Sequence, residues 1–398
     1  MSAGPTAADG PQQLKPAAWR VPLAIAFAAS VASVSGVSLI YPALPVIARD
    51  LDVGESQIGL VIAAYTLPAI VLAPLFGMIA DIKGRRWLLI IGLAIFAIAG
   101  AAAALAPSFG WLLALRAMQG IGFSMITPLT IVLISDLLHE DQELKAQGQK
   151  VVIDRVAMIL LPIIGGALAA VSWRWVYAPF LLVLLLAVAA WIWMPETKAP
   201  GEIDRSRYFS DTWAALGLPR IRLGLCVGFL RFFLDYGLFI YLPLLIGLRL
   251  GLSAVTIGWV LAASAAGAIV TAASVGWIAR QQTPERLLAL AFLACGLGLL
   301  AMGLHVELWT ITAASFAFGL GNGLISPMQK SLLTRNAPVQ LRGGVISVDR
   351  VIQQFAKSLA PALIGVLLLV IRLETVFVLL GLVGIAGALA LARAERDR

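Results

Sequence analysis

The sequence predicts an all-α polytopic membrane protein, with 12 transmembrane helices arranged in two pseudo-symmetric halves of six. Three observations support this fold class. Hydrophobic residues make up 61% of the 398 residues and charged residues only 13%, which leaves too little polar surface for a soluble chain. Apolar runs of about 18 residues or more recur along nearly the whole length. The chain also matches itself at one constant offset of 199 residues, half its length.

Charges, glycines and prolines mark the boundaries of the predicted spans. The first six spans are 21–42, 57–80, 87–106, 111–134, 150–171 and 174–193. The second six are 222–247, 256–279, 287–304, 309–332, 344–370 and 373–392. We therefore expect a cytoplasmic tail at 1–20, a six-helix bundle at 21–193, a linker at 194–220, a second bundle at 221–392 and a tail at 393–398. The end of the linker, "SDTWAALGLP", is typical of a short interfacial helix.

The distribution of Lys and Arg predicts the orientation of the chain. Of the 29 basic residues, 20 fall in the tails and in one set of alternate connections, whereas four fall in the other set and five lie inside spans. Positive residues concentrate on the cytoplasmic side of membrane proteins. We therefore expect an integral membrane protein of a bacterial inner (plasma) membrane with both termini in the cytoplasm. The first span is too long for the apolar core of a signal peptide.

Composition excludes several other functions. The net charge of +8 and the pI near 9.8 do not indicate nucleic acid, because the basic residues lie in short turns between spans. Cys226, Cys295, His139 and His305 are isolated from one another, so no metal site is expected. No catalytic triad and no phosphate-binding loop is present, so we expect neither an enzyme nor a cofactor.

The internal repeat aligns landmarks of the two halves without a gap. "GIGFSMITP" at Gly120 matches "GLGNGLISP" at Gly319, and "GMIAD" at Gly77 matches "GWIAR" at Gly276. In the same register, Pro162 and Gly166 match Pro361 and Gly365. Two parallel repeats around a cavity in the middle of the membrane are typical of transporters that work by alternating access. Helix bends are expected at Pro162, Gly165, Gly166 and Pro361.

The turn between the second and third spans contains a complete family motif. In "GMIADIKGRR", the key positions are Gly77, Asp81, Gly84, Arg85 and Arg86. This pattern resembles the loop signature of the major facilitator superfamily, in particular of its twelve-helix drug:proton antiporters. The resemblance implies a latch that holds the cytoplasmic side shut.

The chemistry of the motif agrees with such a latch. A glycine at 77 allows close approach of a neighbouring backbone. The carboxylate of Asp81 suits the amide end of the eleventh span, where the helix dipole favours an anion. The arginines can pair with Asp136 at the cytoplasmic end of the fourth span. The alternative is a purely topological positive charge, which would explain Arg85 and Arg86 but neither the glycine nor the acid.

Two further spans resemble the same family. The fourth span carries R-x2-Q-G-x-G at Arg116, Gln119, Gly120 and Gly122. A guanidinium in a span costs at least ~2.5–3.5 kcal/mol, so it should face a partner or the cavity. In this family it takes part in proton coupling, and the alternative is an arginine that snorkels to the interface near Trp111.

The fifth span carries only part of the antiporter signature G-x3-G-P-x2-G-G. Pro162, Gly165 and Gly166 are present, but Ala157 and Leu161 replace the two earlier glycines. The first span also lacks the acid that many relatives carry there. Any titrating acid must therefore lie elsewhere.

Charged residues inside the spans indicate possible proton and substrate sites. Asp235 follows Arg231 by four residues, so both share a helical face. The pair is either a proton carrier or a static ion pair. Lys357 is a lone cation that either faces an anionic substrate or balances Asp235. Asp154-Arg155 and Asp349-Arg350 occupy two "DRV" tripeptides, for which a static or gating role is expected.

Aromatic and amide side chains on cavity-prone helices are possible substrate contacts. These are Tyr41, Tyr65, Gln119, Phe123, Tyr236, Phe239, Gln353 and Gln354. An apolar pocket with one or two charges would suit lipophilic amphiphiles. The alternative for each aromatic is a place in the core or against lipid.

The sequence therefore predicts a proton-coupled exporter of small, largely lipophilic organic compounds. Two alternatives stay open: uptake, exchange or facilitated transport of a metabolite, such as an organic anion bound by Lys357 and Arg231, and a receptor that does not transport. The expected partners are a small-molecule substrate, protons and the lipid bilayer. We expect a functional monomer.

Overall fold

A computed structural model describes residues 19–138, 140–197, 216–278, 280, 282–338 and 341–396. Within these ranges the chain is helical and contains no strand. Eleven of the described helical stretches are long and apolar enough to cross a membrane. α15 (Arg342–Leu367) is not among them, because it carries Asp349, Arg350 and Lys357 in addition to its apolar residues. Together with α15, these stretches follow the predicted spans in order, so the predicted fold class is confirmed.

The first half of the chain, which we call the N-half, ends with α9. Its helices are α1 (Arg20–Ser38), η1 (Tyr41–Ala43), α2 (Leu44–Asp50), α3 (Glu55–Ile58), α4 (Leu60–Thr66), α5 (Pro68–Lys83), α6 (Arg86–Ala102), η2 (Ala103–Leu105), α7 (Phe109–Leu137), α8 (Glu140–Val171), η3 (Trp173–Tyr177) and α9 (Phe180–Trp193). The predicted span 57–80 is divided among α3, α4 and α5. α8 begins 10 residues before the predicted boundary at 150, because a polar first segment extends the apolar span.

The second half, the C-half, begins with α11. Its helices are α11 (Pro219–Leu244), the π-helical segment η4 (Leu245–Arg249), α12 (Ala254–Ile278), α13 (Pro284–Leu304), α14 (Leu308–Asn336), α15 (Arg342–Leu367) and α16 (Leu373–Arg396). The predicted interfacial helix in the linker lies outside the described residues, apart from 216–219.

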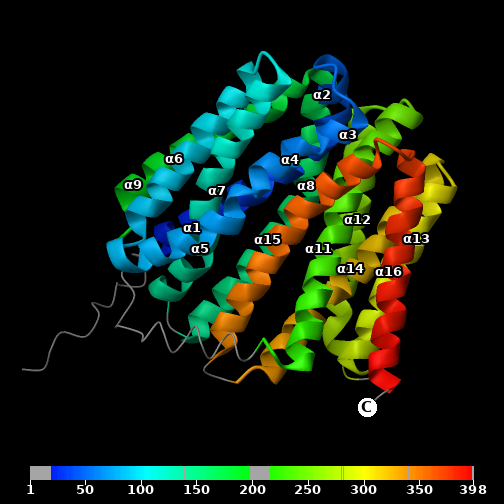
Figure 1. The fold of residues 1–398 in the computed structure, drawn as a ribbon. Coiled ribbons are helices and arrows are strands. Elements are labelled where there is room, and N and C mark those ends of the chain that lie inside the picture. Colours follow the sequence, from blue (N-terminus) through cyan, green and yellow to red (C-terminus); the bar gives the residue numbers. More distant parts are fainter. Residues whose placement is uncertain are drawn as a thin grey trace, which may run out of the picture.

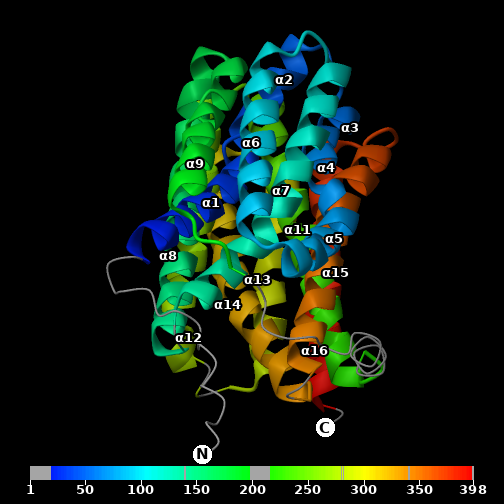
Figure 2. The ribbon, with the colours of Figure 1, turned by 90° about the vertical axis from the view of Figure 1, so that its left-hand side faces the viewer.

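The two halves meet at one end of the molecule and separate toward the other. α8 packs against α12, and α4 packs against α15. In Figure 1 the halves converge at the top, around α2 and α3, and diverge at the bottom, where α16 finishes. We call the first the closed end and the second the open end. The start of α1 also lies at the open end, because Leu23 packs against Ile134 and Leu138 at the finish of α7. Figure 2 shows the same bundle from the side of the N-half.

The repeated proline and glycine landmarks lie where the halves touch. A side chain added at Gly258 in α12 would place its Cβ 2.5 Å from the carbonyl oxygen of Pro162 in α8. In the equivalent contact of the other repeat, a Cβ at Gly59 would lie 3.2 Å from the Cβ of Pro361 in α15. Glycine at both positions therefore lets a helix of one half approach a helix of the other half closely.

A second pair of repeated glycines extends these two contacts. A Cβ at Gly166 would lie 2.4 Å from the carbonyl oxygen of Ala254, and a Cβ at Gly365 would lie 2.4 Å from that of Ser56. We refer to Gly59, Gly166, Gly258 and Gly365 as the seam glycines. The internal repeat therefore builds two equivalent seams between the halves, both toward the closed end.

Candidate functional site

Arg116 is the centre of a buried network in the N-half. Its side chain is fully buried. Its guanidinium donates to the carbonyl oxygens of Val61 (3.1 Å) and Gly36 (2.7 Å) and to the amide oxygen of Gln119 (2.6 Å). It also lies 4.4 Å from the centre of the Tyr65 ring. These contacts join α1, α4 and α7. The snorkelling alternative is wrong, because the side chain points into the bundle and not toward the membrane surface.

A second buried network in the C-half contains the predicted pair Arg231 and Asp235. The two side chains lie 3.9 Å apart, one turn apart on α11. Asn322 on α14 connects them: its amide nitrogen donates to Asp235 at 2.6 Å, and its amide oxygen accepts from Arg231 at 2.8 Å. All three residues are buried. The amide therefore fixes the carboxylate and the guanidinium relative to each other.

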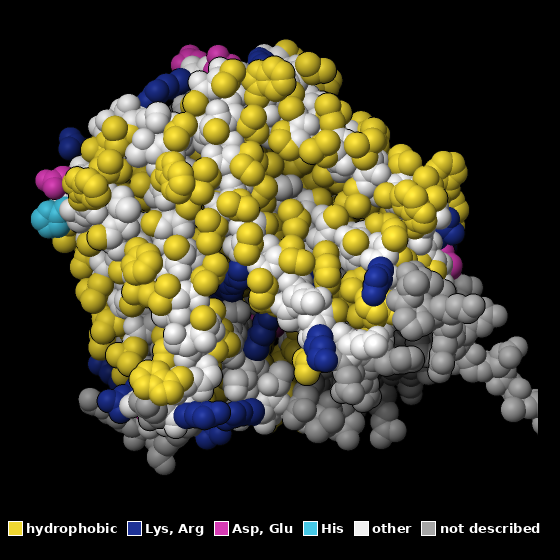
Figure 3. All heavy atoms as spheres, turned by 180° about the vertical axis from the view of Figure 1, so that it is seen from behind, with side chains coloured by type: hydrophobic (Ala, Val, Ile, Leu, Met, Phe, Trp, Pro, Cys, Tyr) yellow, Lys and Arg dark blue, Asp and Glu magenta, His cyan; other side chains and the backbone are white. Residues whose placement is uncertain are grey.

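Two more cations act on Asp235 from other helices. The carboxylate interacts electrostatically with Arg231, then with Arg155 on α8 and Lys357 on α15. Because Arg155 belongs to the N-half and the others to the C-half, this cluster lies between the halves. We call Arg155, Arg231, Asp235 and Lys357 the central charge cluster. Figure 3 shows Lys and Arg side chains in and around a hollow in the lower part of the molecule, toward the open end.

Aromatic side chains lie beside the central charge cluster on its closed-end side. Tyr41 and Phe239 stack across the halves with ring centres 5.6 Å apart. A side-chain hydrogen bond joins Tyr41 to Tyr236. Phe123 packs against Tyr65 with ring centres 4.8 Å apart. The structure therefore brings the predicted aromatic residues together near the predicted charges.

The predicted glutamines have partners of their own. Gln353 donates to Asp349 at 2.6 Å, and Gln329 donates to the same carboxylate at 2.8 Å. Gln354 accepts from Lys357 at 2.7 Å. These amides hold the side chains of Asp349 and Lys357 in place. Arg350, which follows Asp349 in α15, is exposed.

The two "DRV" tripeptides differ in their contacts. Asp154 accepts from Lys150 at 2.8 Å and from Ser30 at 2.7 Å, so its charge is balanced within the N-half. Asp349, within the part of the chain that the structure describes, accepts hydrogen bonds from the amides of Gln329 and Gln353 alone. Arg155 and Arg350 interact electrostatically with the acids that precede them, without a direct ion pair in the described part of the chain.

The turn between α5 and α6 contains an ion-paired cluster within the N-half. Arg85 pairs with Asp136 of α7, as the sequence suggested. Gly84 has φ of +97°, a conformation that favours glycine. Glu196 accepts from the backbone amide of Arg85 at 2.8 Å and from that of Arg86 at 3.3 Å, at the start of α6. A carboxylate is favourable there because the helix dipole is positive at its first turn.

The expectation for Gly77 in this turn is wrong, and the expectation for Asp81 concerns a side chain that the structure does not describe. Nothing lies within 4 Å of the Cβ that a side chain at Gly77 would add. The close backbone approach predicted at Gly77 is therefore absent, because the halves are apart at this end. The side chain of Asp81 lies outside the described residues, although its backbone belongs to α5.

Sequence reasoning missed several residues of these networks and of the closed end. Asn322 occupies the position equivalent to Phe123 in the repeat, and a lone amide inside an apolar span was an available signal. Glu196 follows the last span of the N-half and had no local signature. Glu55 of α3 binds Arg249 across the halves at 2.7 and 3.2 Å, while Glu374 of α16 binds the same guanidinium at 2.7 Å. We call these three residues the closed-end clamp.

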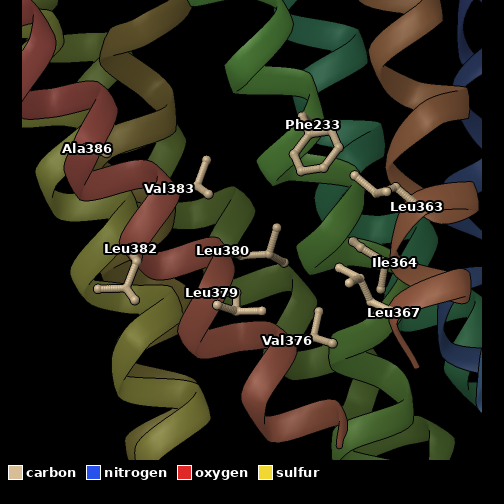
Figure 4. Close-up of a pocket in the computed structure, with 10 residues that line it drawn as sticks. All are labelled: Phe233, Leu363, Ile364, Leu367, Val376, Leu379, Leu380, Leu382, Val383 and Ala386. Atoms are coloured by element: carbon tan, nitrogen blue, oxygen red, sulfur yellow. The ribbon is translucent and has the colours of Figure 1, made fainter. Parts of the chain in front are cut away.

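An apolar pocket of about 460 Å³ lies apart from these charges. It is formed by α11, α15 and α16, and Figure 4 shows aliphatic side chains around Phe233. Several of its lining residues, including Leu363, Leu382 and Val383, are exposed on the outer surface of the bundle. Such a surface suits lipid chains, and we assign no substrate to it.

A helical membrane bundle of two repeats, with a charged site between them, defines the class of secondary transporters. Residues 26–361 and 225–398 match the family model described as Major Facilitator Superfamily. The chain belongs to the major facilitator superfamily and is an integral membrane transporter of that family.

Similar proteins include two curated relatives with efflux or resistance in their names. The chain is 35% identical over 160 residues to the MFS efflux transporter aclA of Aspergillus oryzae, covering 40% of this chain and 29% of aclA. It is 33% identical over 157 residues to the quinolone resistance protein NorA of Staphylococcus aureus, covering 39% of this chain and 40% of NorA. The matches thus span less than half of these relatives.

A solved structure of the nucleoside transporter NupG is similar in fold over nearly the whole chain. The TM-score is 0.81, with 94% of this chain and 99% of the NupG chain covered. Sequence identity is 11%, so this likeness describes the fold alone.

Proposed function

We propose that the protein exports small, largely lipophilic organic compounds in exchange for protons, by alternating access. One observation carries this proposal: a buried, protonatable carboxyl at Asp235 lies between two halves that are joined at one end and separate at the other. Between described residues, the hydrogen bonds and ion pairs that cross the halves lie at the closed end or near its seams, as at Arg249–Glu55 and Thr66–Ser358. This arrangement is one of the two end states that alternating access requires.

Asp235 is the proposed proton carrier. It is the negative member of the central charge cluster, which otherwise contains three cations. Protonation would remove that negative charge and leave the cations of both halves to repel one another. The proton would thus change the relative stability of the two conformations, which is what coupling requires.

Orientation and direction complete the proposal. We place both termini in the cytoplasm of a cell whose inner membrane holds the protein, so the open end faces the cytoplasm. Arg85, Arg86 and their neighbours Gly77, Asp81, Gly84 and Asp136 would then form a cytoplasmic latch that engages when this end closes. The names of aclA and NorA support export, since one is an efflux transporter and the other a quinolone resistance protein.

A second candidate is uptake or exchange of a metabolite on the same fold. One observation favours it: Ala157 and Leu161 stand where the antiporter signature has glycines. In that case the same charge cluster would bind substrate while protons moved in the same direction or not at all.

Reconstitution tests the proposal directly. Candidate compounds are those that become less toxic to pump-deficient cells when the cells express this protein. These compounds would be added outside proteoliposomes that have an acidic lumen. We expect accumulation inside that stops when a protonophore removes the gradient. Accumulation at the same rate with and without the gradient would contradict proton-coupled export.

A further inference from the structure

We propose that the central charge cluster binds an anionic group of the transported compound, held between Arg155 and Lys357. The chemical class is an aromatic carboxylate. This inference rests on the proposed function only in taking the space between the halves as the transport path. It specifies the charge of the substrate, which neither the fold nor the relatives define.

Asp235 has its direct contacts within the C-half. Its carboxylate accepts a hydrogen bond from Asn322 at 2.6 Å and lies 3.9 Å from the guanidinium of Arg231. Arg231 in turn donates to the amide oxygen of Asn322 at 2.8 Å. One acid and one base therefore form a closed unit with their amide, and the other two cations of the cluster are left in excess.

Lys357 has only neutral neighbours in direct contact. Its ammonium donates to Gln354 at 2.7 Å and lies 4.6 Å from the ring centre of Phe232 and 5.9 Å from that of Tyr236. Among the described residues, no carboxylate lies within ion-pair distance of it. A partly buried ammonium without a counter-ion is costly in a membrane interior, and a bound anion would remove this cost.

Arg155 faces the same space from the N-half. The charges that act on it are those of Arg231, Asp235 and Asp154. Asp154 offers little compensation, since its two carboxylate oxygens already accept from Ser30 and Lys150. In the described part of the chain, the guanidinium of Arg155 makes no ion pair or hydrogen bond, and a carboxylate can accept two parallel bonds from it.

The route from the open end is also basic. Lys330 of α14 and Arg350 of α15 are exposed, and Lys330 interacts electrostatically with Arg231, Arg350 and Arg155. The nearby acid, Asp349, interacts electrostatically with both Lys330 and Arg350 and offsets only part of their positive charge. A path with an excess of one sign of charge concentrates ligands of the opposite sign, and Figure 3 shows basic side chains around the hollow.

Aromatic rings beside the cations define the rest of the ligand. Phe232 and Tyr236 flank the ammonium of Lys357, while Tyr41 and Phe239 stack nearby across the halves. A planar aromatic body would pack on these rings while its carboxylate reached the two cations. A lipophilic cation, by contrast, would place its charge beside three positive groups.

A charge series on one aromatic body tests this inference at equilibrium. The purified protein would be titrated with 1-naphthoate, the neutral 1-naphthamide and the cationic 1-naphthylmethylammonium, with binding followed by calorimetry without any pH gradient. We expect naphthoate to bind about tenfold or more tightly than either analogue, and to weaken as salt rises. Failure of naphthoate to bind, or equal binding of the ammonium, would overturn the inference.

Variants locate the site. Lys357→Gln and Arg155→Gln should each weaken naphthoate binding by about tenfold or more, whereas Lys357→Arg should retain it. The matched control is Arg335→Gln, an exposed cation near the finish of α14 and outside the cluster, which should bind as the unmodified protein does. Unchanged binding in both glutamine variants of the cluster would refute the assignment, and the size-exclusion profile of each variant confirms that it is folded.

The two proposals fail separately. Binding without a gradient depends on neither direction nor proton coupling. Gradient-driven export of a cationic compound by the protein, with full activity in Lys357→Gln, would remove the anion site and leave the proposed function intact. Tight naphthoate binding with gradient-independent flux would retain the anion site and remove proton-coupled export.

Discussion

Asp235 differs from Asp154 in its partners. Asp154 is balanced by Lys150 and Ser30 within the N-half, whereas Asp235 interacts with cations from both halves. Its charge can therefore influence how the halves sit relative to each other. The sequence placed Arg231 and Asp235 on one helical face, but Asn322 and Arg155 reach them from other helices and could not be predicted from local spacing.

Asp235→Asn should abolish gradient-driven transport while substrate exchange without a gradient continues. Asparagine keeps the size of the side chain and its bond to Asn322 but cannot carry a proton. The measurement compares both kinds of flux in the same proteoliposomes. Asp154→Asn is the control and should keep gradient-driven flux, and normal gradient-driven flux in Asp235→Asn would exclude Asp235 as the proton carrier.

Arg116→Lys should destabilise the folded N-half. An ammonium cannot donate at once to Gly36, Val61 and Gln119, which the guanidinium joins. The loss of one or two charge-assisted bonds in a buried site costs about 2–4 kcal/mol. Thermal unfolding in detergent measures this loss of stability. The control is Met118→Leu, at an exposed position of the same helix. Equal melting temperatures for the two variants would show that the network contributes little to stability.

At the scale of helices, the internal repeat predicted more than the number of spans. Pro162, Gly166 and their equivalents Pro361 and Gly365 were recognisable as paired landmarks, and they prove to lie in two equivalent seams. What the repeat could not predict was the partner across each seam. The expectation for Gly77 failed for the same reason, since close packing there depends on which end of the molecule is closed.

Gly258→Ala should weaken the seam between α12 and α8. The added methyl group would lie 2.5 Å from the carbonyl oxygen of Pro162, and such overpacking costs about 1–3 kcal/mol. The closed-end conformation should lose population as a result. Gly276→Ala on the same helix is the matched control, because nothing lies within 4 Å of its added Cβ.

Spin labels report this shift. Cysteines at Gln57 and Ser253, two exposed positions on opposite halves of the closed end, would be labelled in a background without Cys226 and Cys295. We expect longer label separations in Gly258→Ala than in Gly276→Ala. Identical distance distributions would show that the seam does not set the closed-end equilibrium.

At the scale of the whole molecule, hydropathy was sufficient to predict the membrane fold, and the self-match at a constant offset of 199 residues predicted its two-fold repeat. Those signals are spread over hundreds of residues and survive local exceptions such as the charged α15. The state of the molecule was not predictable, because it depends on contacts between distant residues. Arg249 and Glu55 are separated by nearly half of the chain and meet only in the closed-end clamp.

Glu55→Gln and Glu374→Gln should differ in their effect on the closed end. Both remove one acid from Arg249, but only Glu55 lies in the other half. A partly exposed ion pair contributes up to about 1 kcal/mol, so Glu55→Gln should reduce the closed-end population by up to about fivefold. The same spin-label pair measures the closed-end population. Raised salt should reduce the difference in this population between the unmodified protein and Glu55→Gln. An equal shift in both variants would show that the clamp does not act between the halves.

Exchange of substrate for protons is the central claim of this account, and the pH inside proteoliposomes tests it most directly. A pH-sensitive dye would be enclosed in the lumen, and a transported compound would be added outside, with protein-free liposomes measured in parallel. The account predicts that the lumen becomes more alkaline as the compound enters, because protons leave in exchange, and that Asp235→Asn shows no such change. A lumen that becomes more acidic, or that keeps its pH while labelled compound enters, would contradict it.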